Sequence, residues 1–248
     1  MNPEFRLHFL SQWKKYFNNA DLPIVFYYSD NPGDTTVIQP ENKQHCMICH
    51  LKKVFSGESL AFSKESLKCS GAKRYLGFSD TIRPGFEYFL SCGIENEMEG
   101  ERYKRSPEIV REIMKNQKKS LITGKYIVFR RWDKIGENDN PEVVIFFATP
   151  DVLSGLFTLS GFDQADNNST IAPFGAGCGS IIHYPYIEKD SENPKAVIGM
   201  FDVSARPCVM PGILSFAVPM VKFVKMMKYM DESFLITGSW KEVQKRIQ

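Results

Sequence analysis

The spacing of apolar residues divides the chain into helical and extended segments. In residues 5–17 apolar side chains recur every three or four positions, which is the period of an amphipathic helix. Short runs rich in β-branched and aromatic residues, such as 22–28 and 143–148, are typical of buried strands. The same patterns predict further helices at 45–55, 71–76, 109–114, 152–159, 220–230 and 240–247, and further strands at 59–62, 86–90, 125–132, 195–201 and 214–218.

The order of these segments favours a mixed β-sheet with flanking helices. Helices and strands alternate without a regular βαβ cadence, and no internal repeat is visible, so we expect an α/β or α+β fold. Strands 125–132 and 143–148 flank a polar loop and are expected to form a hairpin. Residues 131–141 are the best linker candidate, but the hairpin explains them equally well. We therefore expect residues 1–248 to form a single domain.

Composition and charge exclude several classes of function. The chain has 31 Lys and Arg against 29 Asp and Glu, dispersed along its length, which argues against a nucleic-acid partner. The longest apolar run, 143–148, is far shorter than the ~20 residues of a membrane-spanning helix. Residues 1–17 lack the apolar core of a signal peptide, so a cytoplasmic location is expected. In that compartment the six cysteines are expected to be thiols, metal ligands or core residues rather than disulfides.

The first chemical motif is Cys46-Met-Ile-Cys49-His50. Its C-x-x-C-H spacing is that of c-type haem attachment, which the expected cytoplasmic location disfavours. On a helical wheel Cys46, Cys49 and His50 lie opposite the apolar face. Near a helix N-terminus, beside His50 and Lys53, a thiolate is stabilised and becomes a better metal ligand or nucleophile. The alternative is that another element covers this face and buries both thiols.

Two further cysteines add to this motif. Cys69, together with Cys178, Cys46 and Cys49, would provide four ligands for zinc or an iron–sulfur cluster. Cys178 is surrounded by Gly175, Gly177 and Gly179, which would let backbone amides approach a bound cofactor, an anion or the oxyanion formed beside a Cys178 nucleophile. The alternative is a glycine-rich turn that leads into the helix containing His183.

Charged residues in the second half of the chain suggest one more candidate. Asp202 and Arg206 follow an apolar strand, where they would pair with each other, or where Arg206 would hold the carboxylate or phosphate of a small anionic ligand. The run 100–105 is expected to be a solvated surface. Lys222, Lys225 and Lys228 are expected on the wet side of an amphipathic helix, with its Met-rich side in the core or at the interface of a homodimer.

Taken in order, these motifs resemble those of a known family. The matching segments are Leu22-Pro-Ile-Val-Phe-Tyr-Tyr-Ser-Asp30, Cys46, Cys69-Ser-Gly-Ala-Lys-Arg-Tyr-Leu-Gly-Phe78, Gly100-Glu-Arg-Tyr-Lys104, Pro150-Asp-Val-Leu-Ser154, residues 173–178 and residues 199–206. They resemble the prokaryotic family of unknown function number 169, also called ArCR, over about residues 9–227. The resemblance implies one unit without an established activity. It also implies that Cys46, Cys69 and Cys178, here called the cysteine trio, match positions that are usually cysteine, whereas Cys49 does not.

Three hypotheses for function follow. The first is a protein that binds a metal or an iron–sulfur cluster through the cysteine trio, with Cys49 or His50 as a fourth ligand and Arg206 near an open position for an anionic ligand. The second is an enzyme with Cys178 as nucleophile, His183 or His50 as base and Arg206 holding the substrate. The third is a metal-free binding module or homodimer whose cysteines belong to the core.

Overall fold

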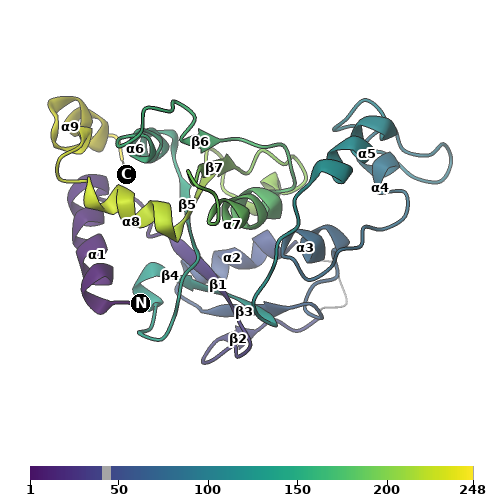
Figure 1. Cartoon of the computed structure of the whole chain (residues 1–248), viewed down its shortest axis with the longest axis horizontal. Helices are drawn as coiled ribbons and strands as arrows, with labels where there is room; N and C mark the ends of the chain where they lie inside the picture. The colour runs from purple at the N-terminus through teal and green to yellow at the C-terminus, as the bar shows by residue number, and fades with distance from the viewer. Residues whose placement is uncertain (41–45, 248) are drawn as a thin grey trace.

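The computed structural model describes residues 1–40 and 46–247, which form one mixed β-sheet with helices on both faces (Figure 1). The strand order within this part of the chain is β2-β3-β4-β1-β5-β8-β7-β6. Neighbouring strands are antiparallel except for the parallel pairs β2–β3 and β6–β7. The strands are β1 (Ile24–Ser29), β2 (Thr36–Val37), β3 (Leu60–Ser63), β4 (Tyr126–Arg131), β5 (Val143–Ala148), β6 (Thr170–Ile171), β7 (Ala196–Gly199) and β8 (Leu214–Pro219).

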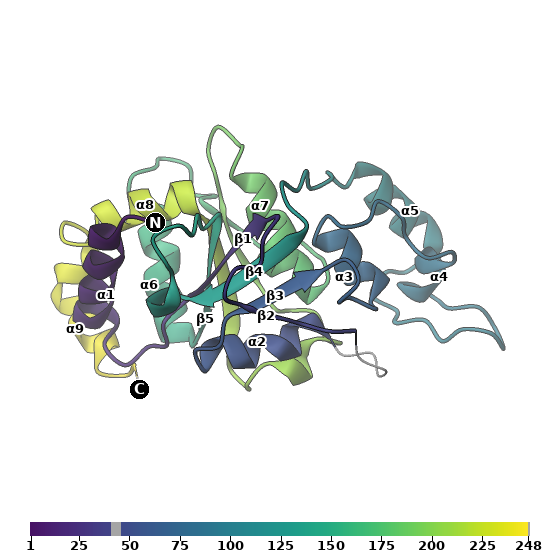
Figure 2. The ribbon, with the colours of Figure 1, turned by 90° about the horizontal axis from the view of Figure 1, so that it is seen from below.

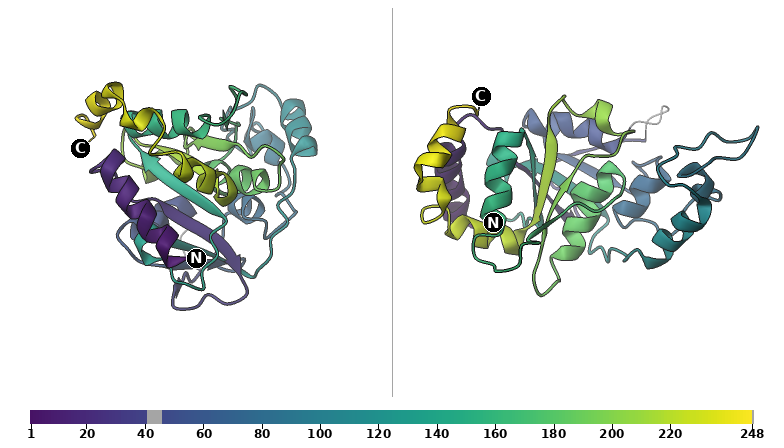
Figure 3. Two further views of the ribbon diagram at one scale, coloured as in Figure 1. Left: turned by 60° about the vertical axis from the view of Figure 1, so that its left-hand side comes forward. Right: turned by 90° about the horizontal axis from the view of Figure 1, so that it is seen from above.

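The helices divide between the two faces of the sheet (Figures 2 and 3). One face packs against α1 (Pro3–Phe17), α6 (Pro150–Ser160), α8 (Met220–Lys228) and α9 (Gly238–Gln244). The other packs against α2 (Met47–Phe55), α3 (Ser70–Tyr75), the π-helix η2 (Gly179–His183) and α7 (Tyr184–Glu188). The remaining helices are α4 (Phe86–Phe89), α5 (Pro107–Asn116), and the 3-10 turns η1 (Trp132–Lys134), η3 (Arg206–Cys208) and η4 (Phe234–Ile236).

Alternation along the central strands explains why the sheet has two apolar faces. In β5, Val144 and Phe146 enter the core beneath α1, α6 and α8, whereas Val143 and Ile145 enter the core beneath α2 and α7. Successive side chains of a strand point to opposite faces, so a strand that is covered on both sides must be continuously apolar. The predicted mixed sheet with flanking helices is confirmed.

The sheet repeats one strand order in its two halves. Strands β1 to β4 lie in the order β2-β3-β4-β1, and strands β5 to β8 lie in the corresponding order β6-β7-β8-β5. The two halves meet where β1 pairs with β5 in antiparallel orientation. The ladders correspond as well, because the six residues of β1 pair with all of β4 and the six of β5 pair with all of β8. This duplication, of residues 24–131 and 143–219, is the internal repeat that the sequence analysis did not detect.

Two strand predictions are wrong. The expected hairpin of 125–132 with 143–148 does not form, because β1 lies between β4 and β5 and pairs with both. Residues 86–90 are not extended, because Phe86–Phe89 form α4 after Gly85, whose φ of 76° is in the left-handed region that favours glycine.

The helix predictions need smaller corrections. The predicted helix 45–55 corresponds to α2, which begins at Met47, and position 45 lies outside the described residues. On α8, Lys225 and Lys228 are exposed as expected, but Lys222 is buried and only 2% exposed. Burial lowers the pKa of its ammonium group, because desolvation disfavours the charged form.

The two halves differ most in the connection to their last strand. Residues 76–125 lead from α3 to β4, carry α4 and α5, and project from one end of the molecule (Figures 1 and 2). In the second half, only residues 209–213 separate η3 from β8. Among the described residues, no helix is long and apolar enough to cross a membrane.

Candidate functional site

A cavity of about 610 Å³ lies where α2, α3 and η2 begin, on the sheet face covered by these helices. Its walls also include α4 and the segments that follow β6 and β7. All three members of the cysteine trio line it, together with the carboxylates of Glu101 and Asp202. Its aromatic lining residues are Tyr75, Phe86, Phe89, Tyr103, Phe174 and Phe201.

Each cysteine of the trio stands at the start of a different helix. Cys46 is the N-cap residue of α2, and Cys69 is the N-cap residue of α3, where its Sγ accepts a hydrogen bond from the Ala72 backbone N–H at 3.5 Å. Cys178 directly precedes η2. The trio therefore comes together from segments that are far apart in sequence, and each sulfur lies near helix-terminal amides that favour negative charge.

The thiols are close enough to affect one another. Burial raises the pKa of Cys46, and the neighbouring Cys69 and Asp202 add to the increase. Burial also raises the pKa of Cys178 well above its ordinary value, with smaller contributions from Cys69, Cys46 and Asp202. Without a cation in the cavity, the Cys178 thiol is therefore protonated at neutral pH.

Two glycines allow η2 to approach α2 and α3 closely. A Cβ on Gly177 would lie 2.5 Å from Ile48 Cδ1, in the first turn of α2. A Cβ on Gly179 would lie 2.9 Å from Tyr75 Cε1, in α3. Gly175 and Gly177 line the cavity, whereas Gly179 is not among the described lining residues. Gly177 thus lets the start of η2 approach the start of α2, and Gly179 lets it approach the last residue of α3.

The glycine-rich loop holds an anion that belongs to the chain itself. The Gly177 backbone N–H donates to Asp202 Oδ2 at 2.8 Å. The other oxygen, Oδ1, accepts hydrogen bonds from the backbone N–H of Ser204 at 3.0 Å and from its hydroxyl at 2.8 Å. The Asp202 carboxylate is therefore fixed at the cavity wall by three hydrogen bonds.

Arg206 is not among the described residues that line the cavity, although the neighbouring Ala205 is. Arg206 Nη1 donates to the carbonyl oxygens of Ile213 at 2.6 Å and Met200 at 3.3 Å, so it joins the ends of the β7–β8 connection. Among the described residues that line the cavity, the arginine is Arg83, whose guanidinium carbon lies 4.1 Å from the ring centre of Phe89.

The two candidate histidines also lie outside the described cavity lining. The His50 ring contacts Phe62 edge to face, with 5.8 Å between ring centres. His183 is buried and its Nδ1 lies 2.8 Å from Ser120 Oγ. Burial lowers the pKa of His183 to about 4, with a smaller effect from the Arg74 charge, so its ring is neutral at pH 7. Neither histidine is among the described residues that line the cavity.

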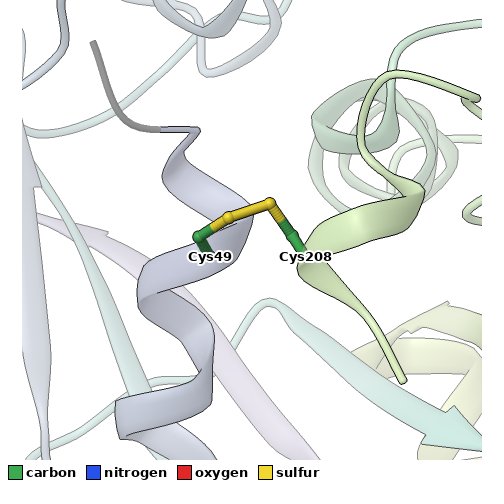
Figure 4. The surroundings of a disulfide bond; sticks show 2 residues. All are labelled: Cys49 and Cys208. Carbon is green, nitrogen blue, oxygen red and sulfur yellow. A yellow bond between two sulfur atoms is a disulfide. The ribbon is translucent and has the colours of Figure 1, made fainter. Parts of the chain in front are cut away.

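Cys49 forms a disulfide with Cys208, which corrects the expectation that the cysteines are not in disulfides (Figure 4). The bond joins α2 in the first half of the chain to η3 in the second half. The partners are 159 residues apart, a pairing that the C-x-x-C spacing could not indicate. While this bond is intact, Cys49 is not available as the fourth ligand of the trio.

The arrangement of acidic and thiol groups limits what the cavity can hold. Within residues 1–40 and 46–247, no group of three or more His, Cys, Asp or Glu side chains is arranged to hold a single metal ion. Sequence reasoning also missed part of the lining, because Glu101 and Tyr103 belong to the run expected to be solvated. The aromatic Tyr103 within this charged run, half-buried in the structure, is the signal that could have indicated contact with the cavity.

Comparison with known proteins identifies a family. The sequence model of the family DUF169, described as uncharacterised ArCR, matches residues 14–229. No curated protein and no solved structure matches the chain.

The disulfide gives a prediction for stability. Reduction of Cys49–Cys208 should lower the free energy of unfolding by up to about 5 kcal/mol, because the bond limits the conformational entropy of the unfolded chain. Urea unfolding with and without reductant measures this difference. On reduction, the Cys92→Ser variant should lose as much free energy of unfolding as the unmodified protein. The free energy of unfolding of Cys208→Ser should not change with reductant. Equal urea midpoints for the oxidised and reduced protein would contradict the prediction.

The thiols of the metal-free protein should react in a defined order. Cys92 is exposed, whereas Cys178 is buried and its pKa is raised, so iodoacetamide should alkylate Cys92 much faster at pH 7. A higher pH should increase the Cys178 rate, because the thiolate then becomes populated, but Cys178 should still react more slowly than Cys92. Peptide mass spectrometry over time measures both rates. Faster reaction at Cys178 would favour the hypothesis of a Cys178 nucleophile.

Proposed function

We propose a function for this chain, which belongs to the DUF169 family of uncharacterised proteins: it binds an iron–sulfur cluster through the cysteine trio. The observation that carries the proposal is that three free thiols, supplied by three separate helix starts, line one cavity. The fourth free cysteine, Cys92, is exposed and is not among the described lining residues.

Thiolates are the usual ligands of iron–sulfur clusters, and hydrogen bonds to sulfur tune the cluster potential. Cys69 Sγ already accepts such a bond from Ala72 N–H. The three thiols and the Asp202 carboxylate also place potential negative charge close together, as their mutual effects on the thiol pKa values indicate. A cationic metal centre between them would offset that repulsion.

The size of the cavity supports a cluster rather than a single ion. Zinc–sulfur bonds of about 2.3 Å place the sulfurs of a single-ion site roughly 4 Å apart. The described residues contain no group arranged in this way. In a four-iron cluster each cysteine binds a different iron atom, so the cysteine sulfurs lie farther apart than around one ion. The cavity of about 610 Å³ has room for a group of this size.

The aromatic part of the cavity supports a second ligand beside the cluster. Phe86, Phe89 and Tyr103 come from the connection 76–125 and provide apolar surface. Arg83 lines the same cavity. It would hold the anionic group of a ligand, which is the role that the sequence suggested for Arg206. A small organic anion with a flat apolar portion fits this combination, because guanidinium groups bind carboxylates and phosphates and aromatic rings stack on flat groups.

Anaerobic reconstitution with ferrous iron and sulfide tests the cluster. We expect near-stoichiometric iron and acid-labile sulfide, together with the broad visible absorption of thiolate-bound iron. The variants Cys46→Ser, Cys69→Ser and Cys178→Ser should each lose most of this iron, because each removes one thiolate ligand. Iron and sulfide assays measure the loss, and circular dichroism identifies any variant that has failed to fold.

Matched variants make the result specific to the trio. Cys92→Ser should load like the unmodified protein, as should the double variant Cys49→Ser/Cys208→Ser, because none of these three sulfurs belongs to the trio. Folded protein that takes up no iron and sulfide would disprove the cluster. Tight uptake of zinc alone that depends on the same three cysteines would replace it with a single-ion site.

A further inference from the structure

The two halves of the sheet relate the cysteines of the trio to one another by position. This relation leaves one position, the counterpart of Cys69, without a cysteine. In each half, a helical segment lies between the two parallel strands, β2 and β3 in the first half and β6 and β7 in the second. Cys46 begins this segment in the first half, and Cys178 stands near its start in the second half. A twofold axis through the β1–β5 pair places both segments on the same face of the sheet.

The residues that follow these two cysteines support their correspondence. His50 is the fourth residue after Cys46, and His183 is the fifth after Cys178. The second segment therefore has one more residue between its cysteine and its histidine. It forms a π-helix over Gly179–His183. A π-helical turn closes i→i+5 instead of i→i+4 hydrogen bonds, so it takes up one extra residue without moving the ends of the segment.

The same correspondence relates Cys69 to Asp202. Each follows the third strand of its half, β3 or β7, and each begins a helical turn. The Cys69 carbonyl accepts a hydrogen bond from Lys73 N–H, and the Asp202 carbonyl accepts one from Arg206 N–H, both from the residue four positions later. The side chains also act alike, since Cys69 Sγ accepts from Ala72 N–H and Asp202 Oδ1 accepts from Ser204 N–H.

Asp202 also lies in the cavity. It lines the same cavity as the trio. Its carboxylate is held in place by Gly177 N–H and by Ser204. The cavity is thus lined by two corresponding pairs: Cys46 with Cys178, and Cys69 with Asp202.

We infer that Asp202 is the fourth ligand of the cluster and binds the iron atom that the trio leaves without a thiolate. This inference rests on the proposed iron–sulfur cluster. Carboxylate oxygen is a harder ligand than thiolate sulfur and holds cluster iron less firmly. The Asp202-bound iron is therefore the one that exchanges, and the one to which a small anionic ligand in the cavity has access.

Replacing the oxygen ligand with sulfur tests this assignment. The reconstituted protein is treated with a mild oxidant and desalted, iron and sulfide are counted, and the three-iron form of the cluster is detected by electron paramagnetic resonance. We expect the unmodified protein to lose one iron per cluster and to show the three-iron signal. Asp202→Cys should keep all of its iron and suppress the signal, whereas Asp202→Ala should lose the iron faster than the unmodified protein.

The controls separate a ligand from a structural residue. Glu101→Gln removes the other carboxylate of the cavity lining and should behave like the unmodified protein. Retention of iron by Asp202→Cys is a gain that damaged packing cannot produce. If the cluster forms but Asp202→Cys and Asp202→Ala lose iron as the unmodified protein does, the inference is wrong and the cluster stands. If folded, unmodified protein forms no cluster, both are wrong.

Discussion

The antiparallel pairing of β1 with β5 is the interaction on which the rest of the structure depends. Only three residue pairs form it, Ile24 with Ile145, Val25 with Val144 and Phe26 with Val143. These pairs turn two four-stranded units into one continuous sheet and set the relative position of the two halves. Because the halves are related by a twofold rotation about an axis perpendicular to the sheet, their corresponding helices lie on the same face. The site exists because the starts of those helices then face each other across the join.

Burying several ionisable side chains in one cavity has an electrostatic cost, which nearby glycines and backbone amides reduce. Three thiols and a carboxylate line one cavity, and burial, with a smaller effect from neighbouring groups, disfavours the charged forms of Cys46 and Cys178. The absence of side chains at Gly177 and Gly179 provides the space, and the Gly177 amide stabilises the carboxylate of Asp202. The disulfide Cys49–Cys208 ties the same two halves together at α2 and η3. Such an arrangement stabilises positive charge in the cavity.

The sequence predicted those features that depend on local patterns. Strands 22–28, 143–148 and 214–218 were recognisable because both of their faces are buried, and α1 because its apolar period is regular. Residues 86–90 were misjudged, because four residues are too few for a helical period to show. The hairpin failed because the sequence alone gives no sign that β1 lies between β4 and β5. Lys222 was predicted to be exposed because it shares the helical spacing of Lys225 and Lys228. That spacing does not show which other parts of the chain pack over α8 and bury it.

For the site, the sequence pointed to the cysteines but not to their partners. Cys46, Cys69 and Cys178 stood out as residue types, whereas the link from Cys49 to Cys208 and the hydrogen bonds of Arg206 are tertiary contacts that no spacing reveals. The duplication was hidden for the same reason, because it survives in strand order and capping rather than in a repeated motif.

Divergence between the halves, rather than their likeness, creates the space beside the candidate ligands. The second half joins η3 to β8 through residues 209–213, whereas the first half inserts residues 76–125 at the corresponding point. That insertion supplies Arg83, Phe86, Phe89 and Tyr103 to the cavity wall. Two equal halves would have left the helix starts open to solvent. The common core therefore sets the geometry of the four candidate ligands, and the insertion in one half shapes the cavity beside them.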